Sequence, residues 1–243
     1  MRSEGRHSPP VSQQRGPLHG TITDLTEQLY HRGRLNVYLD GRFAFGVSAE
    51  IAAAEGLQPG RVLSATDVAR LLRADALQAA REVALRFLSF RPRSEAEVRS
   101  YLERRKGYPP DVVTDVLAWL RDRGYIDDTA FAQFWVADRI TYRPRGHRLL
   151  RAELRRKGVA RETVEAALEP LDQQGEALIE QAARMRLRRL AAADKADFQR
   201  FRTKMAPYLA RHGFDYDDIA AIVRQLWDEL QSDDALLNSS DEG

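Results

Sequence analysis

The sequence of 243 residues contains no cysteine, so neither a disulfide framework nor a thiolate-bound zinc site can form. No run of apolar residues approaches the ~18 that a membrane-spanning helix needs. The first stretch, MRSEGRHSPPVSQQRGP, is polar and lacks the apolar core of a secretory signal. We therefore expect a protein of the reducing cytoplasm that has no membrane segment.

Sequence motifs of common enzymes are also missing. The chain has no phosphate-binding GxxxxGK[ST] loop, no HExxH and no GxSxG, and its five histidines are scattered at no metal-ligand spacing. The adjacent acids Asp127 and Asp128 could suggest a metal site, but their position before a predicted helix favours capping and charge complementation. We expect no catalytic residue, no cofactor and no bound metal, and hence no enzyme.

What is present begins with a β-rich segment over residues 18–63. The stretch RLNVYLDGRFAFGV alternates apolar and polar residues on both sides of Asp40-Gly41. An Asp-Gly pair between such stretches is a strong signal for a tight β-hairpin, because both turn positions need a positive φ. An earlier strand near residues 20–30 could pair with this hairpin, and Ser48 is placed to cap a short helix after it.

From residue 64 onward the apolar spacing is helical. Ser64 and Asp67 form an N-terminal capping signature for a first helix. The helical phase shifts near Asp75, which predicts a break there. Pro92 is expected to end the helix, because proline cannot continue the hydrogen-bond ladder.

A helical unit of about 50 residues recurs three times along this region. In each copy a helix ends at a glycine in a left-handed C-terminal position, and an acidic residue four positions later begins the next helix. An apolar quartet follows at one fixed offset in all three copies. The glycines are Gly107, Gly158 and Gly213; the acids are Asp111, Glu162 and Asp217; the quartets are Val113, Val116, Leu117, Leu120, then Val164, Ala167, Leu168, Leu171, then Ile219, Ile222, Val223, Leu226. A leading helix completes each unit, at about 76–90, 128–141 and 175–191.

These patterns predict a mainly α protein made of three tandem three-helix repeats. Such short units bury little surface alone, so stacking should produce an elongated, curved array with a concave face. A small segment containing the β-hairpin precedes it. The predicted boundaries are a disordered tail at 1–17, the β-rich segment at 18–63, repeats at 64–125, 126–172 and 173–231, and an acidic disordered tail at 232–243.

Positive charge is concentrated rather than spread. The formal net charge is only +2, yet residues 139–161 hold nine bases and one acid, a net charge of +8. A milder basic cluster lies in the first repeat. Solvated helix faces elsewhere in the chain mix both signs, so a face of one sign favours a polyanionic or acidic partner, and the planar guanidinium suits phosphate and carboxylate. The predicted binding residues are Arg91, Arg93, Arg139, Arg143, Arg145, Arg148, Arg151, Arg155, Arg156 and Lys157.

One short basic phrase occurs twice, as SFRPRS at 89–94 and TYRPRG at 141–146. In each copy a proline should end the leading helix and hold the two flanking arginines at the same corner of successive repeats. We expect Phe90 to be a core plug between repeats, whereas for Tyr142 a core position and an exposed one stay open. The other aromatic residues at helical spacing are expected in the core: Trp119, Phe131, Phe134, Trp135 and Trp227.

Several of these stretches together resemble the RecX family of RecA regulators. The carriers are ALRFLSFRPRSEAEVRSYL, GYIDDTAFAQFWVADR, RPRGHRLLRAELRRKGV and TVEAALE, over about Ala79 to Glu169 and more faintly to Leu230. The hairpin region resembles an N-terminal extension found in some members. The third repeat departs from the pattern, because it is longer and has no Arg-Pro-Arg.

This resemblance implies a non-enzymatic protein that lies in the helical groove of RecA–single-stranded-DNA filaments. Its implied effect is to modulate, and usually inhibit, strand exchange, ATP hydrolysis and filament growth, and so recombination, DNA repair and the SOS response. The expected partners are RecA and the RecA–DNA filament, with direct contact to single- or double-stranded DNA left open, and the expected state is a monomer.

Two other functions stay open from the residues alone. The first is a stand-alone nucleic-acid-binding repeat protein, which would bind bare DNA or RNA with a steep salt dependence. The second is a scaffold for another acidic protein partner, without any nucleic acid.

Overall fold

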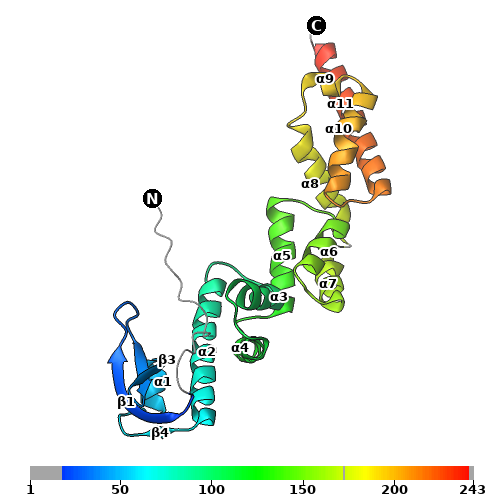
Figure 1. The fold of residues 1–243 in the computed structure, drawn as a ribbon. Helices are drawn as coiled ribbons and strands as arrows, with labels where there is room; N and C mark the ends of the chain where they lie inside the picture. The colour runs from blue at the N-terminus through cyan, green and yellow to red at the C-terminus, as the bar shows by residue number, and fades with distance from the viewer. Residues whose placement is uncertain (1–17, 172, 241–243) are drawn as a thin grey trace. The chain divides into compact units, whose positions relative to one another are not determined.

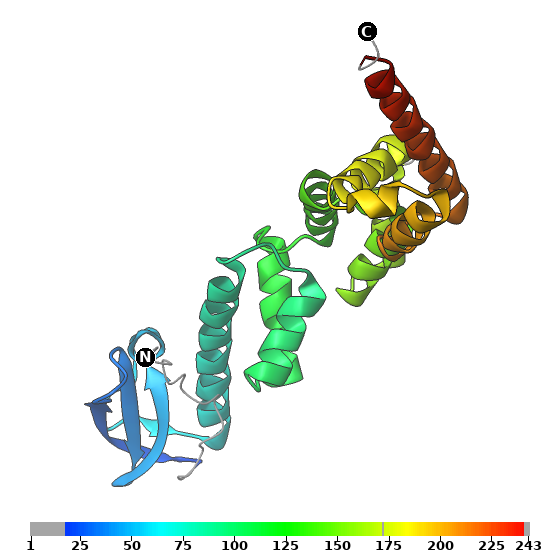
Figure 2. The same cartoon turned by 90° about the horizontal axis from the view of Figure 1, so that it is seen from above.

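The computed structural model describes residues 18–171 and 173–240, with side chains as far as residue 232 (Figures 1 and 2). The chain divides after Ile126 into two compact units. The first contains the strands and one helical module, and the second contains only helices. No helix of the described residues is long and apolar enough to cross a membrane.

The first unit opens with a four-stranded antiparallel sheet whose strand order is β3-β2-β1-β4 (blue to cyan in Figure 1). The predicted hairpin is confirmed: Asp40 and Gly41 join β2 to β3 with φ of 47° and 81°. The earlier strand is confirmed as well, since β1 pairs with β2. Ser48 caps the short helix α1 by accepting from the Ile51 amide at 3.1 Å. The elements are β1 (Gly20–Glu27), β2 (Arg34–Leu39), β3 (Arg42–Ser48), α1 (Ala49–Ala54) and β4 (Val62–Leu63).

The long helix α2 (Ala65–Leu88) joins this sheet to the first helical module. Ser64 and Asp67 form the predicted capping box at its start. The predicted break near Asp75 is wrong, because α2 runs through it without interruption. The shift in apolar phase has another cause. Before Asp75, Val68 and Leu71 pack into the core of the sheet, whereas after it Ala76, Ala80 and Ala84 belong to the core of the helical module.

Asp75 itself lies at the change from one core to the other, with 4% of its surface exposed. Its carboxylate accepts from the Ser48 amide at 2.8 Å and pairs with Arg34 at 2.7 Å. A buried carboxylate is tolerated only when it is hydrogen-bonded or paired. Asp75 therefore fixes β2 and β3 against α2, and the β-rich segment packs on the helix as part of the first unit.

The first helical module consists of the C-terminal half of α2, α3 (Glu95–Ser100) with the π-helical turn η1 (Tyr101–Arg105), and α4 (Pro110–Asp122). Gly107 has the predicted positive φ, at 73°, and the predicted quartet on α4 is buried. From Leu102 to Gly107 this module has one residue more than the second module has from Leu154 to Gly158. The π turn absorbs that residue, since the Lys106 amide bonds to the Tyr101 carbonyl five residues back at 3.1 Å.

The second compact unit holds two helical modules around one apolar core. Their glycines, Gly158 and Gly213, have φ of 78° and 86°, and both predicted quartets are buried. The elements are α5 (Asp128–Tyr142), α6 (His147–Arg156), α7 (Arg161–Leu168), η2 (Glu169–Leu171), α8 (Gly175–Leu187), α9 (Ala192–Lys195), α10 (Phe198–Arg211) and α11 (Tyr216–Ser240). The connection between α8 and α10 runs over residues 188–197 and contains the short α9, which makes the third repeat longer than the second.

The two modules of this unit meet backbone to backbone. The Gly146 amide donates to the His212 carbonyl at 2.9 Å. A Cβ atom at Gly146 would lie 2.3 Å from the Gly213 carbonyl oxygen, and one at Gly213 would lie 2.4 Å from the Leu149 Cβ. Glycine is required at both positions by this close approach.

The α11 helix extends to Ser240, so residues 232–240 belong to it rather than to a separate acidic tail. The predicted tail at 1–17 and residues 241–243 lie outside the described residues. The curved shape of the predicted array stays a prediction.

We predict that Asp75→Ala lowers the free energy of unfolding of the first unit by about 2–4 kcal/mol, because it leaves Arg34 and the Ser48 amide without their buried partner. Urea unfolding followed by far-UV circular dichroism measures this. The matched control is Asp115→Ala, which removes an ion pair to Arg73 with both side chains about half exposed and should change stability little. Equal stabilities of the two variants would contradict the role assigned to Asp75.

Candidate functional site

The two Arg-Pro-Arg corners turn their second arginine inward. The Arg93 guanidinium lies over the Phe87 ring, 4.0 Å from its centroid, and that ring stacks on Tyr101 at 3.9 Å. Arg145 instead pairs with the buried carboxylate of Glu153. Burial lowers the pKa of both guanidinium groups, with the neighbouring arginines adding to the effect. These two members of the predicted basic set therefore support the corner from within.

The first arginine differs between the two corners. Arg91 pairs with Glu97 at 2.7 Å and donates to the Pro92 carbonyl at 2.8 Å. Glu97 also belongs to the capping box that opens α3, together with Ser94. Arg143 is exposed and forms no ion pair with any residue that the structure describes. Only the second corner thus leaves its first arginine available to a partner.

Glu153 on α6 gathers several of the predicted binding residues around one buried carboxylate. It is 9% exposed and accepts from Trp135 Nε1 at 2.9 Å, from Arg139 Nε at 3.3 Å and from Arg145. The Trp135 ring lies near two cations, with Arg139 at 4.0 Å and Lys157 Nζ at 4.2 Å from its centroid. A buried carboxylate with this many donors is a structural cluster, so Arg139, Arg145 and Lys157 have internal partners.

The exposed face of α6 carries a further set of pairs. Arg151 forms a two-pronged bond to Glu165 on α7, with distances of 2.7 to 3.1 Å, and Arg155 lies 3.7 Å from the same carboxylate. The hydrogen bonds from Arg151 lower the pKa of Glu165 below its usual value. These pairs are exposed and therefore weak, so negatively charged groups on a partner could replace Glu165 as the counter-charge of both arginines.

Three of the ten predicted residues remain exposed without an ion pair to any described residue: Arg143, Arg148 and Arg156. Arg148 donates to the Ala210 carbonyl at 3.2 Å and lies over the Tyr216 ring at 5.9 Å. The structure adds two arginines of the same kind, Arg104 and Arg105, at the end of η1. The sequence holds a signal for them, because Arg-Arg-Lys-Gly occurs both at 104–107 and at 155–158.

The aromatic residues of the repeated phrase are both exposed. Phe90 is 77% exposed, so its prediction as a core plug is wrong; it lies beyond the end of α2 and is not part of the core of the first helical module. Tyr142 is 72% exposed, which decides the question left open for it. Phe134 is 48% exposed and also not in the core. The core position is confirmed for Phe131, which is buried, and in part for Trp119, Trp135 and Trp227, which pack against the cores half-buried.

The last helix of each module carries acids on its surface. The α4 helix exposes Asp111 in its first turn and Asp122 at its end. The α7 helix exposes Glu162 in its first turn, and the exposed Glu169 follows it as the C-cap. In helix-turn-helix proteins that read DNA, this second helix of the pair enters the major groove. Carboxylates on that face would repel phosphate.

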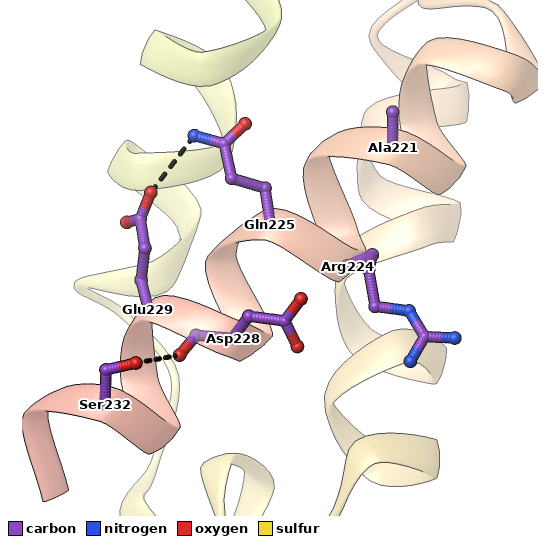
Figure 3. A pocket seen from close by; sticks show the side chains of 6 residues that line it. All are labelled: Ala221, Arg224, Gln225, Asp228, Glu229 and Ser232. Carbon is purple, nitrogen blue, oxygen red and sulfur yellow. Dashed lines mark hydrogen bonds between the residues drawn. The ribbon is translucent and has the colours of Figure 1, made fainter.

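The described residues contain no cluster suited to a metal ion. Asp127 acts as the predicted cap, accepting from the amides of Thr129 at 2.7 Å and Ala130 at 3.1 Å. No group of three or more His, Asp or Glu side chains there could hold a metal ion. An open hollow of ≈ 680 Å³ follows one face of α11, and in its lining Gln225 donates to Glu229 at 3.0 Å and Ser232 donates to the Asp228 backbone carbonyl at 2.9 Å (Figure 3).

We predict that Glu153→Gln destabilises the second unit by about 2–4 kcal/mol, because it leaves Arg139 and Arg145 without their buried counter-charge. Thermal and urea unfolding followed by tryptophan fluorescence would measure the loss. Glu165→Gln is the control: its exposed pair with Arg151 should contribute little. If Glu153→Gln unfolds like the wild type, the cluster is not a structural support.

Comparison with known families agrees with this architecture. Residues 20–64 match the regulatory protein RecX N-terminal domain, residues 80–129 match the first three-helix domain of RecX, and residues 127–168 match the second. These matches coincide with the sheet, the first helical module and the second helical module.

Curated relatives and solved structures give the same result. The chain is 30% identical to the regulatory protein RecX of Bacillus subtilis strain 168 over 217 residues, covering 88% of this chain and 79% of the relative. It is 30% identical to that of Clostridium botulinum strain Eklund 17B, covering 84% and 95%. A crystal structure of regulatory protein RecX aligns with a TM-score of 0.61 and 28% identity, covering 83% of this chain and 98% of that one. RecX from Lactobacillus salivarius shares the fold, with a TM-score of 0.55 and 24% identity, over 63% and 97%. The chain therefore belongs to the RecX family of regulatory proteins.

Proposed function

We propose that this protein binds RecA and RecA–single-stranded-DNA filaments and modulates RecA, with inhibition as the expected sign, in recombination and DNA repair. One observation carries the proposal beyond family membership: two successive modules each expose an aromatic residue, followed by arginine, at equivalent positions 52 residues apart. A partner that repeats, such as a filament of identical protomers, suits a surface that repeats.

The mechanism is steric and electrostatic rather than chemical. Contacts with neighbouring protomers would bridge them or block addition at a filament end. The arginines proposed for these contacts are Arg104, Arg105, Arg143, Arg148 and Arg156, each of which is exposed and has no ion pair to a described residue. Acidic protein surface and DNA phosphate are both suitable counterparts. The inward-facing arginines Arg93 and Arg145 would contribute by holding the corners in shape.

A stand-alone DNA-binding function is the second candidate, and the basic face of α6 favours it. The acids on α4 and α7 argue against the usual helix-turn-helix mode, because those helices would have to enter the groove. Direct DNA binding would therefore use phosphate contacts from α6. This function predicts tight binding to bare DNA. The slope of log K against log salt concentration should be roughly −0.7 to −0.9 for each phosphate contact. A scaffold for another acidic protein would instead give a pulldown that survives nuclease and lacks RecA.

We predict that adding the protein to RecA on single-stranded DNA lowers the steady-state rate of ATP hydrolysis in a dose-dependent manner. The physical reason is that a protein bridging or capping protomers changes how many protomers are active on the strand. A coupled ATPase assay, with bare-DNA binding measured in parallel at the same salt, tests this. An unchanged rate at several-fold excess over RecA would reject the proposal, and tight binding to bare DNA alone would favour the second candidate.

We predict that the triple variant Arg143→Glu, Arg148→Glu, Arg156→Glu weakens filament binding by about 10- to 100-fold, because three exposed cations become anions. Arg145 is left intact, since its pairing with Glu153 is internal. The control triple Arg188→Glu, Arg189→Glu, Arg202→Glu makes the same net charge change on exposed arginines of the third repeat. Equal weakening by both triples would mean that net charge, and not the corner, drives binding.

A further inference from the structure

Phe90 and Tyr142 expose large apolar rings at equivalent places in two modules. Phe90 is 77% exposed and Tyr142 is 72% exposed, and 52 positions separate them, the same offset that relates Arg91 to Arg143. A single exposed aromatic residue is ordinary on a protein surface. The recurrence of one at the same corner of two modules, each followed by arginine, is not accounted for by packing within either module.

The chain next to each ring is held in place by neighbouring residues. Before Phe90, the Ser89 amide bonds to the Leu85 carbonyl at 2.9 Å; after it, Arg91 is tied to Glu97 at 2.7 Å. Tyr142 is the last residue of α5, and the next amide, that of Arg143, bonds to the Arg139 carbonyl at 3.0 Å. Rings presented on an ordered backbone lose little conformational entropy when they bind, which is the condition for a strong contact.

The charges around Phe90 favour a protein pocket over a nucleic-acid base. A stacking platform for single-stranded DNA needs a groove of uncompensated positive charge beside the ring. Next to Phe90 the two arginines are instead engaged within the module: Arg91 pairs with Glu97 at 2.7 Å, and the Arg93 guanidinium lies 4.0 Å from the centroid of the Phe87 ring. At Phe90 an aromatic ring thus stands next to an ion-paired arginine, which is the composition of a protein–protein hot spot. Tyr142 is assigned the same role because it occupies the equivalent position in the second module.

We propose that Phe90 and Tyr142 are paired docking anchors, each of which inserts its ring into an apolar pocket on a protein subunit of the filament. Because the anchors are equivalent in the two modules, they fit the same pocket on two protomers. Phenylalanine and tyrosine share the ring and differ by the hydroxyl, so the pocket recognises the ring. This inference rests on the proposed function and names the contact by which the filament would be held.

The test uses the full-length chain with Phe90→Ala, Tyr142→Ala and the double variant, and the reciprocal pair Phe90→Tyr, Tyr142→Phe. The control is Tyr30→Ala, which removes an aromatic residue that is 91% exposed in the β1–β2 loop, away from the repeated phrase. Binding to preassembled RecA–single-stranded-DNA filaments and to bare single-stranded DNA is measured by fluorescence anisotropy, and thermal unfolding verifies the fold of each variant.

We expect each alanine variant to bind filaments about tenfold more weakly. The double variant should lose about a hundredfold, while the reciprocal pair and Tyr30→Ala bind like the wild type. All variants should unfold at the wild-type temperature, because the altered rings are exposed. Wild-type affinity of the double variant for filaments would overturn the anchors and leave the proposed function intact. A parallel loss of bare-DNA binding would assign the rings to base stacking and overturn the protein pocket. If the wild type itself does not bind filaments, the proposed function fails and the anchors fail with it.

Discussion

The inward packing of the second arginine at each Arg-Pro-Arg corner is the contact on which both helical modules depend. A proline ends the leading helix, and the chain must turn sharply to start the next one. In the first module Arg93 holds this turn by lying over Phe87, which stacks on Tyr101. In the second, Arg145 does so through Glu153. Glu153 and Tyr101 are 52 positions apart, as are Arg139 and Phe87. Equivalent positions therefore hold the second arginine of the corner by ion pairs in one module and by aromatic rings in the other. An aromatic stack needs no counter-charge, whereas the ionic version requires the full set of donors around Glu153 to offset desolvation.

This arrangement explains why a dense run of arginines does not become an equally dense surface charge. Of the cations between 139 and 161, Arg139 and Arg145 share Glu153, and Arg151 and Arg155 share Glu165. One acid near the middle of the run and one on the next helix thus engage four bases. A smaller set of arginines, including Arg143, Arg148 and Arg156, remains exposed without an ion pair to a described residue. A surface of few, separated arginines is better suited to discrete contacts with a structured partner than to sequence-independent attraction along a polyanion.

The sequence predicted the features that depend on local rules. Glycines after helices, capping residues and the apolar quartets follow from backbone conformation and helical period, and the structure confirms them from Gly107 to Leu226. It did not predict features that depend on contacts between distant segments. The residues around Asp75 suggest a helix break, because the local sequence does not show that Arg34, which is far away in the chain, forms an ion pair with Asp75. Phe90 is expected in the core because it is apolar. The sequence does not show that the helix ends before Phe90 and that its side chain is exposed there. The arginine run likewise reads as free charge, since the acid that engages Arg151 belongs to another helix, 14 residues away.

The third repeat departs from the motif for a reason that the packing supplies. It has no Arg-Pro-Arg corner, yet its helix end closes on the corner of the second module, where the Gly146 amide bonds to the His212 carbonyl and Gly146 lies against Gly213. Arg148 adds a bond to the Ala210 carbonyl at the same place. A corner whose backbone is pinned on both sides cannot swing, so Tyr142 and Arg143 are presented in one orientation. The third repeat therefore supports the second corner. Its sequence is constrained at Gly213, where it contacts that corner, and it does not need an Arg-Pro-Arg motif of its own. In the first module the corner is stabilised locally, by the capping box of Ser94 and Glu97. That difference accounts for the serine in one copy of the phrase and the glycine in the other.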